Sequence, residues 1–140
     1  MDRGRILTAD EEIRALLAAA KTVAVIGISP KPERDSHRVA AYLKAKGYRI
    51  VPVRPAQEEI LGEKAYARLD DVRGPIDIVD VFRRPEQVPP HAEEALRLKP
   101  RAFWMQEGIE HREAAERLTA AGIDVVMNRC IMREHARLLG

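Results

Sequence analysis

The strongest structural signal in the chain is a continuous apolar run from Val23 to Ile28, rich in β-branched residues. Such a run is typical of a strand buried on both faces of a parallel sheet. It breaks at Gly27 into a polar loop, and an amphipathic pattern from about Ser36 to Lys46 then indicates a helix. This order of strand, polar loop and helix predicts the first βα turn of a mononucleotide-binding unit, where backbone N–H groups and the helix dipole favour phosphate.

The loop after this strand differs from the dinucleotide fingerprint G-x-G-x-x-G. It has only Gly27, and it is stiffened by Pro30 and Pro32. Side chains would therefore supply much of the phosphate binding, and a guanidinium suits a phosphate through its bidentate fork. The candidate binding residues here are Gly27, Ile28, Ser29, Lys31, Arg34 and Ser36. The competing interpretation is a solvated surface loop with an ordinary serine N-cap.

Composition predicts one globular domain spanning residues 1–140, with 46% apolar and 33% charged residues. A net charge of +2, without a basic tract interleaved with aromatics, disfavours a nucleic-acid partner. One cysteine fits a reducing compartment, and no run reaches the length of a membrane span. We therefore expect a cytoplasmic protein without a membrane partner.

Helical and strand patterns alternate along the chain, which predicts right-handed βαβ units and a three-layer, Rossmann-like α/β fold. A Thr8–Glu11 capping box is expected to open the first helix, which runs to about Ala20. We expect a five-stranded parallel sheet of order 3-2-1-4-5. The predicted strands are 23–28, 49–53, 76–81, 102–105 and 124–127, and the later predicted helices are 36–46, one after Pro85, 110–121 and 129–138.

Ligands of open α/β sheets bind beyond the carboxyl ends of the strands, so residues just past each strand are the next candidates. Arg54 follows the second strand, where an arginine accommodates a ribose phosphate; it is equally compatible with a surface residue packed on Pro55. Phe82, Arg83 and Arg84 follow the third strand and could hold the adenine and phosphates of a nucleotide. The competing interpretation is that Phe82 belongs to the core and that Arg83 or Arg84 only pairs with Glu86. Gln106 follows the fourth strand and could bind a polar chain with its amide.

Cysteine and histidine add little to this pattern. Cys130 begins the last predicted helix, but a lone cysteine among apolar residues is more often a small core residue. The four histidines have no metal-ligand spacing, so no metal site is predicted. His37 could assist the anion site, and the other three are expected at the surface.

Several segments together resemble the small stand-alone CoA-binding proteins. The matching segments are residues 25–36, 42–43, 47–48, 51–55, 81–83, 104–108 and 126–130. These proteins are single Rossmann-like domains similar to the nucleotide-binding domain of the succinyl-CoA synthetase α-subunit. The resemblance implies that coenzyme A lies with its phosphates on the loop 28–36 and its adenosine near the end of the second strand. Family members often have Asn where this chain has Arg54, so the resemblance does not support a contact at that position.

Three functions stay open on the sequence. The preferred one is a module that binds coenzyme A or an acyl-CoA without chemistry of its own. An NADP-dependent oxidoreductase would be compatible with Arg54, but the missing second glycine argues against it. The third is an interaction protein that keeps a degenerate nucleotide-binding fold.

Overall fold

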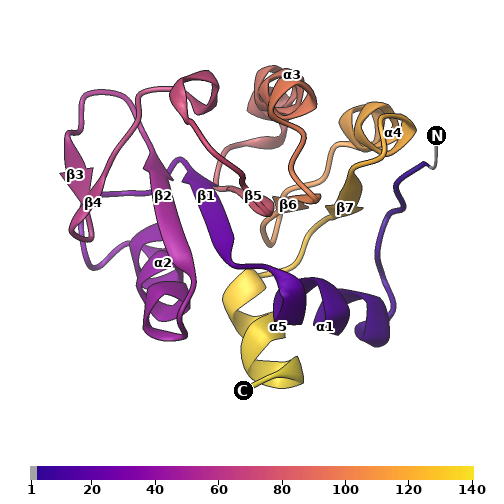
Figure 1. Ribbon diagram of the computed structural model, residues 1–140, viewed down its shortest axis with the longest axis horizontal. Coiled ribbons are helices and arrows are strands. Elements are labelled where there is room, and N and C mark those ends of the chain that lie inside the picture. The colour runs from indigo at the N-terminus through magenta and orange to yellow at the C-terminus, as the bar shows by residue number, and fades with distance from the viewer. Residues whose placement is uncertain (1–2) are drawn as a thin grey trace.

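The computed structural model describes residues 3–140. Its centre is a parallel sheet whose strands, in spatial order, are β2 (Arg49–Val53), β1 (Thr22–Ile26), β5 (Ile78–Val81), β6 (Ala102–Met105) and β7 (Asp124–Val126). A short antiparallel hairpin, β3 (Glu59–Ile60) and β4 (Glu63–Lys64), lies beside β2 (Figure 1). All four strand pairings in the main sheet are parallel, so the predicted five-stranded parallel α/β fold is confirmed.

Helices cover both faces of the sheet, as Figure 1 shows. One face carries α1 (Asp10–Ala19), α2 (Asp35–Ala45) and α5 (Ile131–Leu138). The other carries α3 (Val88–Leu98), preceded by a 3-10 turn at Pro85–Gln87, and α4 (Arg112–Ala120). Because both faces are covered, β1, β5 and β6 are apolar along most of their length. The three predicted layers are present.

The predicted strand order is wrong for one strand, β5, which is the third strand of the main sheet in chain order. The prediction placed it outside the second strand, whereas β5 pairs with β1, and the order in chain numbering is 2-1-3-4-5. The outer edge of β2 is already occupied, because Tyr66 N donates to Pro52 O at 2.9 Å and Arg54 N donates to Tyr66 O at 2.8 Å. The segment after β2 thus covers the edge that a third strand would have used.

This order places the topological switch point at the gap between β1 and β5. The loops that leave these two strands run to opposite faces of the sheet, towards α2 and α3 (Figure 1). Ligand-binding crevices of open α/β sheets form where the connections diverge in this way. The residues after β1 and β5 therefore face each other across the expected binding position.

The start of α1 also differs from the prediction. The helix begins at Asp10 with Ala9 as its N-cap, and Ala9 N donates to Glu12 Oε1 at 3.4 Å. In the predicted capping box, the Thr8 side chain would accept a hydrogen bond from the first turn of the helix. Within residues 3–140 it accepts none, so the predicted pair Thr8–Glu11 is wrong. Glu12, three residues after the N-cap, accepts a hydrogen bond from the backbone N–H of Ala9. This is the carboxylate half of a capping box, shifted by one residue from the predicted pair.

Candidate functional site

Three hollows that share lining residues lie along the carboxyl edge of the sheet, and together they are called the cleft. The loop hollow, about 400 Å³, lies between the segment after β1 and the start of α2. The β2 hollow, about 610 Å³, extends from the end of β2 to α3, and the β6 hollow, about 560 Å³, extends from β5 past the end of β6 to α5. Phe82 lines all three hollows, so the cleft is centred on the residue that follows β5.

Gly27 lets the first loop pass close to the end of β5. Its φ is +83°, and a Cβ at this position would lie 2.4 Å from the carbonyl oxygen of Phe82. Gly27 N donates to Val53 O at 3.0 Å, and Phe82 N donates to Ile26 O at 2.9 Å. The glycine thus closes the gap between β1 and β5 and fixes the floor of the cleft.

Two buried hydroxyls hold the shape of the loop. Ser29 N donates to Ser36 Oγ at 2.9 Å, and Lys31 N donates to Ser29 Oγ at 3.1 Å. Each hydroxyl still has its own O–H to donate, so both can bind an anion while they brace the loop.

The amino end of α2 opens into the same hollow. The helix begins at Asp35, its N-cap is Arg34, and the Arg34 side chain makes no capping hydrogen bond. Ser36 therefore lies in the first turn of the helix and is not its N-cap, which corrects the expectation for this residue. The uncapped amides carry the positive end of the helix dipole, which favours an anion beside Arg34 and Lys31.

Arg54 spans the loop hollow and the β2 hollow. Its Nη1 donates to Ile28 O at 3.2 Å, which ties the end of β2 to the loop after β1. Ile28 itself is fully buried and lines none of the hollows, so only its backbone is near the cleft. The remaining guanidinium donors of Arg54 stay available to a ligand.

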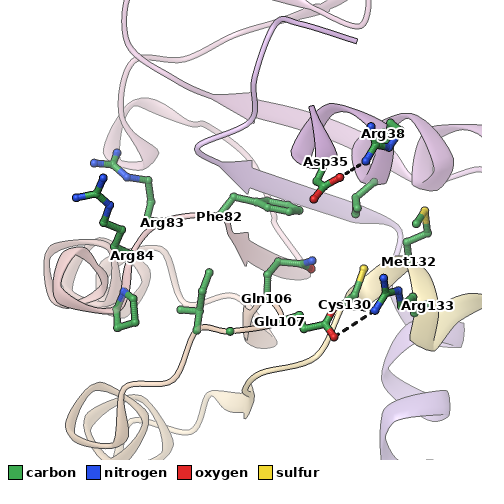
Figure 2. A pocket seen from close by; sticks show the side chains of 14 residues that line it. Asp35, Arg38, Phe82, Arg83, Arg84, Gln106, Glu107, Cys130, Met132 and Arg133 are labelled. Carbon is green, nitrogen blue, oxygen red and sulfur yellow. Dashed lines mark hydrogen bonds and ion pairs between the residues drawn. The ribbon is translucent and has the colours of Figure 1, made fainter. Parts of the chain in front are cut away.

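Two arginines follow Phe82 on the opposite side of the cleft. Arg83 Nε donates to Gln87 Oε1 at 3.1 Å, a neutral partner that leaves its charge uncompensated. Figure 2 shows Arg83 and Arg84 extending from one side of Phe82, whereas Asp35 and Arg38 of α2 lie on the other.

The two ends of the Gln106 amide have different surroundings. The residue is only 4% exposed, and its Oε1 accepts from Ile131 N at 3.1 Å, so it caps the start of α5. Its amide nitrogen makes no hydrogen bond to residues 3–140, and the side chain lines the β6 hollow (Figure 2). The –NH₂ group is the part available to a ligand.

Cys130 lines the same hollow at the start of α5, with its side chain turned towards the cavity (Figure 2). It is half-buried, and so only partly fits the expectation of a small core residue. Glu107 lines the same hollow and is ion-paired to Arg133 Nη1 at 2.8 Å (Figure 2). Glu107 is therefore engaged by a cation.

The cleft is rich in positive charge. Lys31, Arg34, Arg54, Arg83 and Arg84 line it without a carboxylate partner within residues 3–140. Many other basic side chains are paired, such as Arg117 with Glu93 and Arg137 with Asp10. Five uncompensated cations in one cleft are suited to a ligand with several phosphate charges.

Two histidines are not surface residues, which corrects the prediction for them. His91 lies in the first turns of α3, lines the β2 hollow and is bonded to Glu94. His135 is buried in α5, its Nδ1 lies 2.9 Å from Tyr42 Oη, and burial lowers its pKa from the ordinary value. His111 caps α4 by accepting from Ala114 N at 3.1 Å.

No group of His, Cys, Asp and Glu side chains within residues 3–140 is arranged to hold a metal ion. In the same part of the chain, none of the helices has the length and apolar character that a bilayer crossing requires.

The ten predicted binding residues converge on one region. All except Ile28 line the cleft, from Gly27, Ser29, Lys31, Arg34 and Ser36 in the first loop to Arg54, Phe82, Arg83 and Gln106 at the other strand ends. Sequence reasoning missed His91, Glu94 and Arg68 at the β2 hollow. The spacing of His91 and Glu94, three residues apart on a helix, is the signal that could have indicated a pair.

Comparison with known proteins decides the family. The model of the family described as a CoA binding domain matches residues 21–136. The chain belongs to this CoA-binding domain family.

Relatives in the family match over nearly their whole length. An uncharacterized protein of Bacillus subtilis, YneT, is 45% identical over 125 residues, which cover 89% of this chain and 93% of that protein. A solved structure from Thermus thermophilus is 47% identical with a TM-score of 0.90, covering 94% of this chain and all of that one. A hypothetical protein from Pyrococcus horikoshii is 41% identical with a TM-score of 0.91, and the match covers both chains completely. The two solved structures thus share the architecture on which the cleft is built.

Proposed function

We propose that the cleft binds coenzyme A or an acyl-CoA and that the domain performs no chemistry of its own. The observation that carries this proposal is the set of five uncompensated cations that line the three hollows at the switch point of the sheet, together with the uncapped start of α2 beside the loop hollow. Coenzyme A has a pyrophosphate and a ribose phosphate, so it matches a cleft with separated cationic groups. Membership in the CoA-binding domain family supports the same ligand.

The parts of the ligand are assigned by the chemistry of the hollows. The pyrophosphate would lie on the first loop, against Ser29, Lys31, Arg34, Ser36 and the amides after Gly27. The ribose phosphate and adenine would occupy the β2 hollow, with Arg54 on the phosphate. Phe82 and Arg83 would border the nucleotide, and the pantetheine chain would run through the β6 hollow past the free amide of Gln106.

An absence of chemistry is supported by the surroundings of the one thiol in the cleft. Covalent catalysis on a thioester needs a nucleophile with a base in hydrogen-bond reach. Within residues 3–140, Cys130 makes no hydrogen bond through its thiol, and the nearby Glu107 is paired with Arg133. The site thus lacks an evident nucleophile–base pair in the part of the chain that the structure describes.

Two other functions remain as alternatives. An NADP-dependent oxidoreductase would use Arg54 on the ribose phosphate of NADP, but the loop has a single glycine where close pyrophosphate approach favours several. An interaction protein with a degenerate nucleotide fold would have no need of the cationic cleft.

Calorimetric titration with CoA, acetyl-CoA, NADP and ATP separates these functions. We expect CoA and acetyl-CoA to bind more tightly than NADP and ATP. Arg34→Ala should weaken CoA binding by about 1.5–3 kcal/mol, because it removes a charge-assisted contact. Arg101→Ala is the matched control, since Arg101 is exposed at the amino end of β6, away from the cleft. Preference for NADP would support the oxidoreductase, and binding of none of the ligands would support the interaction protein.

A further inference from the structure

A histidine–glutamate pair lines the β2 hollow, whereas Cys130 lines the β6 hollow. His91 Nδ1 is 3.0 Å from Glu94 Oε1, and Glu94 Oε2 accepts from Asp70 N at 3.0 Å. Glu94 is only 8% exposed, so its carboxylate is held in place by both contacts. Both residues line the hollow together with Arg54, Arg68 and Arg83.

The glutamate fixes the tautomer of the histidine. A carboxylate only accepts hydrogen bonds, so the proton of a neutral His91 ring must lie on Nδ1. The other ring nitrogen, Nε2, then presents a lone pair, and it has no hydrogen-bond partner within residues 3–140. The pair therefore supplies a hydrogen-bond acceptor on a residue that lines a hollow with three arginines, Arg54, Arg68 and Arg83.

A hydrogen-bond acceptor on the protein requires a donor on the ligand, and only some groups of a nucleotide are donors. The phosphates are acceptors, and they match Arg54 and the loop cations. A purine with a 6-amino group offers an N–H donor, whereas a purine with a 6-oxo group offers an acceptor at the same position. An acceptor on the protein thus distinguishes these two classes of base.

We propose that His91, held by Glu94, is a specificity-determining residue that accepts a hydrogen bond from the 6-amino group of adenine. This inference rests on the proposed function, because it places the adenosine end of the ligand in the β2 hollow. It extends that function by assigning base selection to a residue pair outside the strand ends.

The test compares CoA with its hypoxanthine analogue, in which a 6-oxo group replaces the 6-amino group. Titrations are done at alkaline pH, because the proposed acceptor exists only on a neutral ring. The parent protein is expected to bind CoA about tenfold more tightly than the analogue, because the analogue sets an acceptor against the lone pair of Nε2. His91→Phe should remove most of this preference, since it keeps a ring of similar size without the nitrogen.

Glu94→Gln gives the sharper result. Its side-chain oxygen can still accept from Asp70 N, while its –NH₂ donates to Nδ1 and moves the ring proton of His91 to Nε2. The preference should then invert in favour of the hypoxanthine analogue. A purely structural pair would change stability or lower both affinities together, and it would not reverse their order.

Phosphopantetheine, which lacks the adenosine, serves as the control ligand, and each variant's thermal midpoint is measured beside the titrations. We expect its binding to be the same in the parent, His91→Phe and Glu94→Gln. Equal affinity of the parent for CoA and its analogue, or an unchanged preference in both variants, would overturn this inference and leave CoA binding intact. Failure of the parent to bind either compound would instead overturn the proposed function, and the inference with it.

Discussion

Asp80 is the least expected residue of the sheet. It lies in β5 between Val25 of β1 and Trp104 of β6, and it is fully buried. Neither carboxylate oxygen has a hydrogen-bond partner among the described residues. Burial raises the pKa of Asp80 well above the ordinary value, because a charge without a partner is costly in this surrounding.

The raised pKa predicts a pH-dependent stability that Asp80→Asn should remove. Below the unfolded-state pKa of about 3.9, the carboxyl is protonated in both states. Above it only the unfolded state releases the proton, so the free energy of unfolding falls with rising pH until the folded-state pKa is passed. Urea unfolding at several pH values should show the parent losing stability relative to Asp80→Asn by up to about 1.4 kcal/mol per pH unit. Parallel curves for the two proteins would show that Asp80 ionises as easily folded as unfolded.

Arg54 should account for recognition of the ribose phosphate. If it holds that group, dephospho-CoA should bind more weakly than CoA by about 1.5–3 kcal/mol, and Arg54→Ala should erase most of the difference. Arg68→Ala is the control within the same hollow, because Arg68 is already paired to Asp70 at 2.9 Å. Equal affinity of the parent for both ligands in a calorimetric titration would remove this role from Arg54.

Single residues also show what the sequence could indicate about the site. Lys31 and Arg34 were recognisable because phosphate chemistry calls for cations directly after a buried strand. His91 was not, since its environment depends on Glu94, Asp70 and the end of β2 meeting in three dimensions. Local patterns therefore identify residues at strand ends more readily than residues brought in by a neighbouring helix.

Among the elements, strands were predicted more accurately than their order. The bounds of β2 and β6 agree with the prediction, because each strand is a short apolar run between clear breaks. The place of β5 beside β1 could not be read in this way. It depends on the segment that contains Tyr66, which covers the outer edge of β2. The paired residues are separated in the sequence, so a local pattern does not predict this contact.

Close approach of β1 and β5 at Gly27 leads to a prediction about this pair of strands. Gly27→Ala should destabilise the fold by more than Gly47→Ala. Both glycines have positive φ, but a Cβ at Gly27 would meet the Phe82 carbonyl oxygen at 2.4 Å, and one at Gly47 would meet nothing within 4 Å. Gly47→Ala therefore carries only backbone strain, about 1–2 kcal/mol. Denaturant unfolding of the two variants measures the difference, and equal losses would mean that the β1–β5 gap tolerates a side chain.

The whole molecule is a sheet whose two faces are covered by helices and whose carboxyl edge carries the polar cleft. Loops after β1, β2, β5 and β6 meet there because the carboxyl ends of parallel strands share an edge. The family of the chain and the fold class were accessible from its sequence motifs, because these motifs are the loops that form this edge.

Binding without turnover is the prediction for the molecule as a whole. Acetyl-CoA incubated with the protein should stay intact, and intact-mass spectrometry should show no acylated protein, since Cys130 lacks an evident activating base in the described structure. A stoichiometric acyl adduct that disappears in Cys130→Ser would contradict this and make the domain an acyl carrier or transferase.

The central claim, that coenzyme A binds in the carboxyl-edge cleft, is tested most directly by mapping the ligand on the protein. Isotope-labelled protein is titrated with CoA, and backbone amide chemical shifts are followed by NMR. We predict that the largest changes fall in residues 27–37, at Arg54, at Phe82 to Arg84, and around Gln106. Changes concentrated instead at the hollow beneath the amino edge, around Lys46, Tyr48 and His135, would contradict the account.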